Sequence, residues 1–222
     1  MTPPLVIVGA GGFARETAQA VDALNSSNPT WDLLGFVDDD PALAGHLIDG
    51  VKVLGPLDAL GDLPDVSVVV CTGRPDNYFS RRRIVERLAF GSDRFATIVH
   101  PSCAIAADVQ IGAGSVLLAH VTATAAVTIS DHVAVMPQSV LTHDDHVHDY
   151  VTVASGVRLG GAAVIEAGAY LGSGVLVREG VRIGAWSLVG MGSVVLHDVP
   201  AAQVWFGAPA RMVRTVELPE QW

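Results

Sequence analysis

Three histidines and three aspartates fall within the segment LTHDDHVHDYV, which spans residues 141–151 of a chain with only 16% charged residues. Side chains of these types bind a metal ion when several of them converge on one point. Alternatively, one histidine can act as a general base if a carboxylate orients its ring and a nearby donor stabilises the oxyanion. The third alternative is a solvated polar turn without chemistry. The choice depends on the secondary structure that positions these residues.

A six-residue repeat covers the second half of the chain and supplies that structure. From Ile105 to Val195, every sixth residue is Ile, Leu or Val in fifteen of sixteen cases. Four positions after each of them comes a small residue or Val, and Asp145 is the only exception. A hexad repeat predicts a three-sided parallel β-helix in which the aliphatic position points inward. Residues eighteen apart then stack in neighbouring coils, and the sixteen hexads form a little over five coils.

The hexad frame places His143 and Asp144 at a corner of the β-helix, between two of its faces. The stacked neighbours of His143 are Ala125 and Gly161, and their small size leaves the imidazole accessible. His143 could act as the base, Asp144 could fix its tautomer, and the Gly161 N–H could stabilise an oxyanion. This corner therefore favours a catalytic site over a solvated turn.

The metal alternative rests on His143 and His148, whose five-residue separation is similar to that of two zinc ligands in trimeric β-helical carbonic anhydrases. In those proteins the third ligand lies two coils upstream, where this chain has Ala107. His146 and His148 flank the inward-pointing Val147, so both project outward from one face. We therefore predict no metal and keep a zinc-dependent hydratase as the weaker alternative.

The first hundred residues alternate between strand and helix patterns. Apolar runs predict strands at residues 5–10, 33–40, 51–55 and 66–73, and helical periodicity predicts a helix at 13–24. A second helix follows the loop that begins RPDNYF. This alternation predicts a small, doubly wound, Rossmann-like parallel sheet with helices on both faces.

A glycine-rich turn, GAGGFA, joins the first of these strands to its helix. In that context glycines allow the backbone to approach a pyrophosphate at the helix N-terminus. NAD and nucleotide sugars both use such a turn, but a β-helix lacks the substrate cleft of an oxidoreductase, which favours a nucleotide sugar. The residues expected to contact this acceptor are Gly9, Gly11, Gly12, Phe13 and Ala14 in the turn, Asp38 and Asp39 after the second strand, and Thr72 and Gly73 after the strand at 66–73.

The composition excludes several classes of partner. The net charge is −10 and the acidic excess is shared equally by residues 1–100 and 101–222, so we expect no basic patch for nucleic acid. No apolar run is long enough to span a membrane. The N-terminus lacks a basic leader, and Cys71 and Cys103 form no CxxC pair, so we expect a cytoplasmic protein with reduced thiols.

Two further predictions concern single titratable or charged side chains. Arg81, Arg82 and Arg83 are expected on a solvated helix face, with contact to a sugar phosphate as the alternative. His120 and His132 fall at corners of the predicted β-helix, where they could line an interface between subunits.

Five segments resemble, in the same order, the hexapeptide-repeat sugar acyltransferases that include sialic-acid O-acetyltransferases and bacillosamine-pathway N-acetyltransferases. The segments are VIVGAGGFARE, GFVDDD, IVHPSCAI, LTHDDHVHDY and WFGAPARMV, and together they run over nearly the whole chain. The resemblance implies a nucleotide-sugar domain at 1–99, a left-handed parallel β-helix at 100–200, and a C-terminal tail at 201–222 that packs on the β-helix. It also implies a homotrimer that binds acetyl-CoA between adjacent β-helices.

The resemblance assigns roles to single residues as well. His143 matches the family's catalytic base, Asp144 its orienting acid, and Gly161 the glycine whose amide faces the thioester carbonyl. At Phe13 and Thr152 some relatives carry a histidine, which changes the contacts expected with the acceptor. The contacts expected with CoA are Gly161, Ser173, Gly190, Met191, Pro209 and Arg211.

These observations together predict an acetyltransferase that uses acetyl-CoA and no metal. The predicted acceptor is the amino group of a nucleotide-linked sugar, such as a UDP-sugar. The alternatives are O-acetylation of a sugar hydroxyl, as in the sialic-acid enzymes, and a non-catalytic trimeric binding module.

Overall fold

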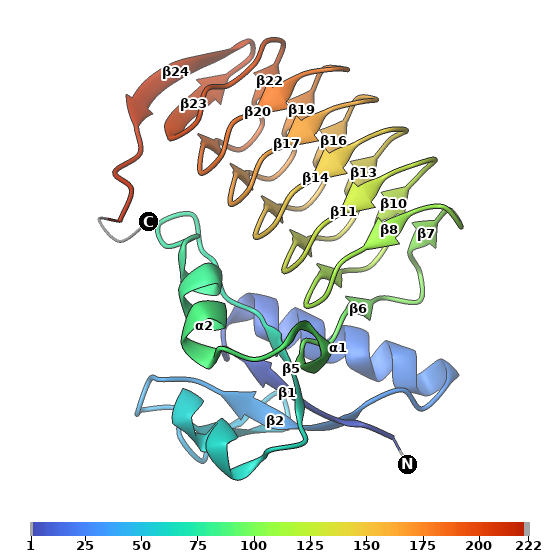
Figure 1. Cartoon of the computed structure of the whole chain (residues 1–222), viewed down its shortest axis with the longest axis vertical. Coiled ribbons are helices and arrows are strands. Elements are labelled where there is room, and N and C mark those ends of the chain that lie inside the picture. The colour runs from blue at the N-terminus through green and yellow to red at the C-terminus, as the bar shows by residue number, and fades with distance from the viewer. Residues whose placement is uncertain (1, 220–222) are drawn as a thin grey trace.

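The computed structural model describes residues 2–219, which form an N-terminal α/β part and a parallel β-helix that extends away from it (Figure 1). The predicted fold class, a Rossmann-like parallel sheet followed by a left-handed parallel β-helix, is confirmed. Within residues 2–219, no helix has the length and the apolar character needed to cross a membrane.

The N-terminal sheet has the strand order β3-β4-β2-β1-β5 in the described part of the chain. Its strands are β1 (Pro4–Val8), β2 (Asp32–Val37), β3 (Leu47–Ile48), β4 (Val51–Gly55) and β5 (Ser67–Val70). β1 pairs in parallel with β2 and β5, and β2 pairs in parallel with β4, as the alternation of strands and helices predicts. The short edge strand β3, antiparallel to β4, is not predicted by the sequence pattern.

Helices cover both faces of this sheet, as expected for a doubly wound fold. They are α1 (Gly12–Ser27), α2 (Ser80–Leu88) and the 3₁₀ helices η1 (Leu57–Asp62) and η2 (Ser92–Arg94). Successive residues of a strand point to opposite faces. Leu5 and Ile7 of β1 accordingly pack with α1, whereas Val6 and Val8 pack with η1 and α2.

The β-helix begins at β6 (Ile98–Val99) and continues through a regular series of short strands. Between residues 104 and 195, all of which the structure describes, sixteen two-residue strands match the sixteen hexads. They are β7 (Ala104–Ile105), β8 (Gln110–Ile111), β9 (Val116–Leu117), β10 (Thr122–Ala123), β11 (Thr128–Ile129), β12 (Ala134–Val135), β13 (Val140–Leu141), β14 (His146–Val147), β15 (Thr152–Val153), β16 (Arg158–Leu159), β17 (Val164–Ile165), β18 (Tyr170–Leu171), β19 (Leu176–Val177), β20 (Arg182–Ile183), β21 (Leu188–Val189) and β22 (Val194–Val195).

Three parallel sheets form the faces of the β-helix, and we name each face by one of its strands. The β13 face contains β7, β10, β13, β16, β19 and β22, and the β14 face contains β8, β11, β14, β17 and β20. The β15 face contains β6, β9, β12, β15, β18 and β21. Each short strand ends on the aliphatic residue of its hexad, which is buried from Leu117 onward, so the hexads build one continuous core.

A C-terminal hairpin extends the β15 face. β23 (Gln203–Gly207) pairs in parallel with β21, and β24 (Ala210–Thr215) returns antiparallel to β23. The turn between them contains a cis peptide bond before Pro209. Ala210 belongs to the core of the β-helix, so this hairpin packs on the last coil.

α2 lies beside the β-helix (Figure 1). Its Arg81 side chain enters the junction between the two parts of the molecule. The Arg81 side chain is 1% exposed and donates to Tyr150 O at 2.9 Å and Thr152 Oγ1 at 2.7 Å. It also donates to Val151 O at 3.2 Å and to Thr72 O at 3.3 Å. Burial lowers the pKa of Arg81 to about 10, which leaves it protonated at neutral pH. The prediction of a solvated helix face is therefore wrong for Arg81.

His132 also lies in this junction instead of at a free corner. Its side chain is buried, its ring stacks on Tyr150 with centroids 5.2 Å apart, and Phe95 meets it edge-on at 4.6 Å. Desolvation lowers the pKa of His132 to about 4, so the ring is neutral at neutral pH. The prediction of a subunit interface at His132 is wrong, because Phe95 of the N-terminal part occupies this corner. His120, the other histidine of that prediction, is exposed.

Candidate active site

The corner between β13 and β14 brings His143 and Asp144 together as the hexad frame predicts. His143 Nδ1 lies 2.8 Å from Asp144 Oδ2, and both side chains are more than half exposed. Asp144 adopts a left-handed backbone conformation (φ 62°), which Asp tolerates better than most residues. With Nδ1 held by the carboxylate, Nε2 is the ring nitrogen that is left to accept a proton from a substrate.

The His143 ring lies directly against Gly161 of the next coil. A Cβ atom built on Gly161 would overlap Cε1 and Nε2 of the imidazole, so any larger residue would displace the ring. The Ala162 N–H donates to His143 O at 2.8 Å, and the Asp144 N–H donates to Ala125 O at 3.0 Å. Within residues 2–219 the Gly161 N–H has no hydrogen-bond acceptor, so it can donate to a ligand next to the ring.

Asp145 is a member of this corner that the sequence argument does not assign to it. Its carboxylate is fully buried inside the β-helix and accepts hydrogen bonds from Thr142 N at 2.7 Å and Ala163 N at 2.9 Å. Burial raises the pKa of Asp145 to about 6. The second inward position of each hexad is the one four residues after its aliphatic residue. Asp145 is the only charged residue at this position in any hexad, so the sequence could have indicated a special role for it.

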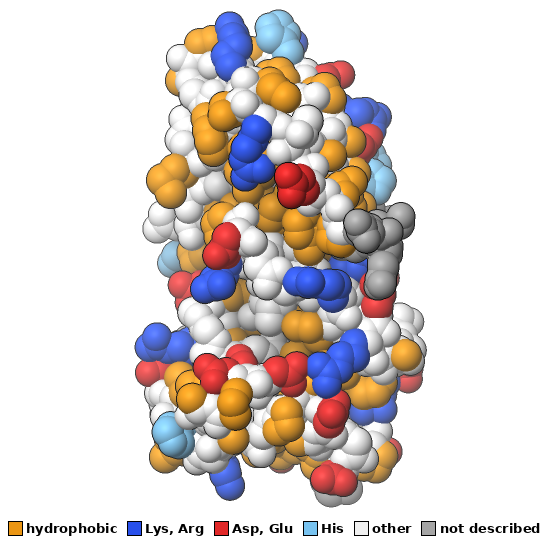
Figure 2. Space-filling model, turned by 90° about the vertical axis from the view of Figure 1, so that its left-hand side faces the viewer, with side chains coloured by type: hydrophobic (Ala, Val, Ile, Leu, Met, Phe, Trp, Pro, Cys, Tyr) orange, Lys and Arg blue, Asp and Glu red, His pale blue; other side chains and the backbone are white. Residues whose placement is uncertain are grey.

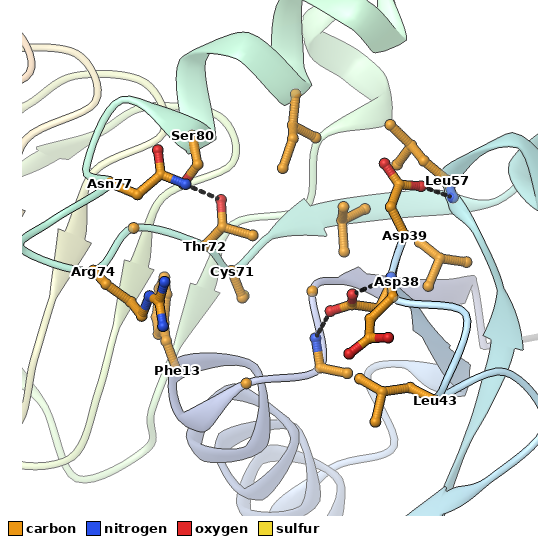
Figure 3. A pocket seen from close by; sticks show the side chains of 18 of the residues that line it. Phe13, Asp38, Asp39, Leu43, Leu57, Cys71, Thr72, Arg74, Asn77 and Ser80 are labelled. Atoms are coloured by element: carbon orange, nitrogen blue, oxygen red, sulfur yellow. Dashed lines mark hydrogen bonds between the residues drawn. The ribbon is translucent and has the colours of Figure 1, made fainter.

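A cavity of about 580 Å³ lies in the N-terminal part, where β1, β2 and β5 end at their carboxyl ends. Parallel α/β sheets bind their ligands at this edge. Asp38 and Asp39 lie at one end of the cavity, and Arg74, Asn77 and Ser80 lie at the other (Figure 3). In the space-filling view, acidic side chains gather on the N-terminal part beside the hollow in the middle of this face (Figure 2).

Eight of the nine residues predicted to contact the acceptor line this cavity. They are Gly9, Gly11, Gly12, Phe13, Asp38, Asp39, Thr72 and Gly73. Ala14 does not line it, because its side chain is buried between α1 and the sheet. The sequence argument missed Arg74, Asn77 and Ser80, although they follow β5 at the same edge of the sheet.

The glycine-rich turn is held close to the neighbouring strand. Gly9 has a φ of 100°, and a Cβ on it would lie 2.9 Å from Cys71 O, so this position requires glycine. The Ala10 N–H donates to Asp38 Oδ2 at 2.9 Å. Asp38 therefore orients the turn, and this interaction brings the acidic end of β2 and the glycine-rich turn into one cavity.

Asp39, at the same end of the cavity as Asp38, is held by different partners. Its carboxylate accepts from Leu57 N at 2.9 Å and forms an ion pair with Arg87 at 2.7 Å. The Leu57 amide, followed by the Arg87 guanidinium, lowers the pKa of Asp39, so it is ionised at neutral pH. An ionised carboxylate at this end accepts hydrogen bonds from a ribose or a base but repels phosphate.

Apart from Gly161, which lies against the His143 ring, the residues expected to contact CoA lie away from His143 in the single chain. Ser173, Gly190 and Met191 fall at corners between the β15 and β13 faces, so the whole β13 face separates them from the His143 corner. Met191 is 80% exposed, whereas Gly190 is buried under the Phe206 ring. Pro209 and Arg211 are exposed in the β23–β24 hairpin.

The histidines at the other positions of the segment do not converge with His143. His146 and His148 are exposed on either side of the buried Val147, as predicted. Among the residues that the structure describes, no three His, Cys, Asp or Glu side chains lie close enough together to hold a metal ion.

Comparisons with known sequences identify similar proteins for most of the chain. Residues 4–88 match the family described as the PglD N-terminal domain. The chain is 32% identical over 206 residues to a GDP-perosamine N-acetyltransferase of Escherichia coli O157:H7, covering 91% of this chain and 82% of that protein. It is also 32% identical over 121 residues to a UDP-N-acetylbacillosamine N-acetyltransferase of Bacillus subtilis, covering 52% and 51% of the two chains.

Solved structures share the same architecture over nearly the full length. A variant of perosamine N-acetyltransferase from Caulobacter crescentus, in complex with CoA and GDP-perosamine, is 27% identical with a TM-score of 0.85. The alignment covers 96% of this chain and 98% of that one. The acetyltransferase domain of PglB from Neisseria gonorrhoeae, in complex with acetyl coenzyme A, is 26% identical with a TM-score of 0.85 and coverage of 96% and 100%.

Proposed function

The chain belongs to the hexapeptide-repeat sugar acyltransferases of the sialic-acid O-acetyltransferase and bacillosamine N-acetyltransferase type, and on this premise we propose that it acetylates the amino group of a nucleotide-linked sugar. The donor of an acetyltransferase of this family is acetyl-CoA. The assignment of the reacting residues rests on the arrangement at one corner. His143 is oriented by Asp144 and lies, accessible to a ligand, against the Gly161 backbone. The Gly161 N–H has no hydrogen-bond acceptor among the described residues.

The geometry of this corner supports one chemical step. His143 Nε2 takes a proton from the sugar amine as the amine nitrogen attacks the thioester carbonyl, which forms the C–N bond. The Gly161 N–H stabilises the oxyanion that develops on the carbonyl oxygen. The C–S bond then breaks, the acetamide is formed, and CoA leaves as a thiolate that can take the proton from the imidazolium. Asp144 holds the ring in the tautomer that this transfer needs.

The N-terminal cavity supports the acceptor assignment. The Caulobacter relative is described in complex with GDP-perosamine, and the Escherichia coli relative carries GDP-perosamine in its name. In our proposal the glycine-rich turn and Arg74 hold the diphosphate, while the ionised Asp39 accepts hydrogen bonds from the nucleoside. Since the cavity has no His143 among its lining residues, the sugar must extend out of it towards a catalytic corner.

The arrangement of the predicted CoA contacts supports a homotrimer. Ser173 and Met191 lie across a whole face from His143, so one chain cannot place both groups around one thioester. A neighbouring copy can bring its own corner to His143, as expected for a site between adjacent β-helices. Leu176 and Leu196 are exposed large apolar side chains on or next to the β13 face, which fits a surface that packs against another copy.

An assay of thiol release tests the proposed function. Purified protein is mixed with acetyl-CoA and with GDP-, UDP- and dTDP-4-amino sugars or sialic acid, and free CoA thiol is followed. We expect release that depends on one nucleotide amino sugar. Release with a hydroxyl acceptor alone would move the assignment to O-acetylation by the same residues. No release with any acceptor, at protein concentrations that detect slow turnover, would contradict the proposed function.

Two histidine variants test the role of the base. We expect His143→Ala to lower kcat by roughly 10²-fold or more, which is the contribution expected of a general base. His148→Ala is the matched control, because this histidine is exposed on the β14 face outside the corner. A kcat for His143→Ala within a few-fold of wild type would contradict the assigned base.

A further inference from the structure

Asp145 departs from the rule that the rest of the β-helix obeys. In every other hexad the second inward position holds a small residue or Val, which the interior accommodates without charge. A carboxylate placed there loses its hydration, and proteins accept this cost where hydrogen bonds to the charge serve a purpose. The exception occurs in the hexad that contains His143, which is the reason to ask what this carboxylate holds in place.

Other polar residues at the same position behave differently. Ser115, Ser139, Ser187 and Ser193 occupy it in four other hexads, and each hydroxyl donates to a backbone carbonyl oxygen. The Ser115 and Ser193 hydroxyls each also accept one hydrogen bond from a backbone N–H, that of Val133 and of Gly207 respectively. Asp145 differs because its carboxylate accepts from two backbone N–H groups, Thr142 N in its own coil and Ala163 N in the next. The carboxylate therefore bridges two coils at their corner.

The two amides that Asp145 binds flank the proposed reaction site. Thr142 immediately precedes His143, and Ala163 follows Gly161 by two residues. A third hydrogen bond, from Ala162 N to His143 O, joins the same two coils. These bonds set the height and angle of the imidazole relative to the Gly161 N–H, and the buried carboxylate supplies two of them.

We propose that the ionised carboxylate of Asp145 is a positioning residue that holds His143 and the Gly161 N–H at the separation the acetyl transfer needs. This inference rests on the proposed function for its catalytic consequence, but the hydrogen bonds themselves do not. Asp145 touches no substrate and acts through the backbone on either side of His143 and Gly161.

The protonation of Asp145 gives this role a pH dependence. The titratable groups that act on the carboxylate are His143 and Asp144 on its own segment, and its stacked neighbours, Val127 and Ala163, do not titrate. Burial raises the pKa of Asp145 to about 6. Above that pH both oxygens accept from amides; below it one oxygen carries a proton, so one N–H loses its acceptor and the corner loosens. Asp145 should thus contribute to the acidic limb of kcat.

Two substitutions test the proposal kinetically. Asp145→Asn keeps the shape but points an N–H₂ group at one of the two amides, and Asp145→Ser installs the residue that four other hexads carry. Both should lower kcat by about 10-fold to 10²-fold, as expected for a misplacement of up to 1 Å, with KM values within about threefold. The contribution of Asp145 to the acidic limb near pH 6 should disappear. Ser139→Ala, at the same hexad position on another corner, should leave kcat unchanged.

Amide hydrogen exchange tests the same proposal without turnover. In the wild-type protein at pH 7 the Thr142 and Ala163 amides should be protected, and in Asp145→Asn or Asp145→Ser at least one should exchange 10-fold faster or more. The Val140 amide, bonded to Val157 O, serves as the internal reference. Unchanged exchange, or unchanged kcat and pH profile in variants of an active enzyme, would overturn the proposal. If the wild-type protein fails to turn over any acceptor, the proposed function fails, and exchange alone decides whether Asp145 holds the corner.

Discussion

The substitution Gly161→Ala displaces the proposed base by an amount that follows from the structure. The added Cβ would overlap Cε1 and Nε2 of His143, so the ring must withdraw by roughly 1 Å to reach an ordinary carbon contact. A misplacement of this size costs on the order of 10² in rate, which corresponds to about 2.7 kcal/mol of transition-state stabilisation. We therefore expect kcat to fall about 10²-fold.

The fold should tolerate this substitution. Gly161 does not lie in the left-handed region, so Ala can adopt its backbone conformation. The His143 side chain is 67% exposed and can swing outward without leaving a cavity. The melting temperature should accordingly stay within about 2 °C of wild type, because the conformational restriction of the unfolded chain by Ala opposes any small loss of contacts.

Thiol release with the acceptor that gives the highest turnover measures the effect. Gly61→Ala is the control, because a Cβ at Gly61 in η1 meets no atom within 4 Å. A crystal structure of Gly161→Ala should show the imidazole moved outward from the β-helix. A kcat within threefold of wild type, with the ring displaced, would refute the argument that the reaction needs His143 at its present distance from the Gly161 backbone.

Two other predictions concern the junction between the two parts of the chain. Arg81→Met removes four hydrogen bonds to buried or partly buried acceptors, so we expect a loss of about 2 kcal/mol and a fall in melting temperature of about 4–8 °C. Arg83→Met, on the exposed side of α2, should change the melting temperature little. The pKa of His132 is lowered to about 4 in the folded protein, so His132 of the unfolded chain binds a proton at a higher pH. The folded state therefore loses stability as the pH falls from about 6.5 to 4. Urea unfolding at pH 7 and pH 4.5 should therefore show up to about 2.5 kcal/mol more acid destabilisation in wild type than in His132→Phe. Equal losses would contradict this assignment.

The hexad period determined the β-helix from sequence alone. Each coil repeats the same local requirement, an aliphatic side chain at every sixth position, so the pattern specifies the three faces without knowledge of any long-range contact. The same arithmetic placed His143 between Ala125 and Gly161, since residues eighteen apart must stack. The pair of His143 with Asp144 followed from adjacency at a corner.

Only the tertiary structure decided how the two parts of the molecule meet. Arg81 donates to backbone carbonyl groups about seventy residues further along the chain, and no local pattern distinguishes it from the exposed Arg83. His132 is likewise buried by Phe95, which belongs to the other part of the fold.

At the His143 corner, too, the sequence determined one part of the arrangement and the tertiary structure the other. The hexad rule marked Asp145 as an exception, but the atoms that its carboxylate binds, Thr142 N and Ala163 N, come from the geometry of two adjacent coils. Sequence determined what repeats along the chain, because repetition is local; packing between distant segments decided which side chains are buried, charged and paired.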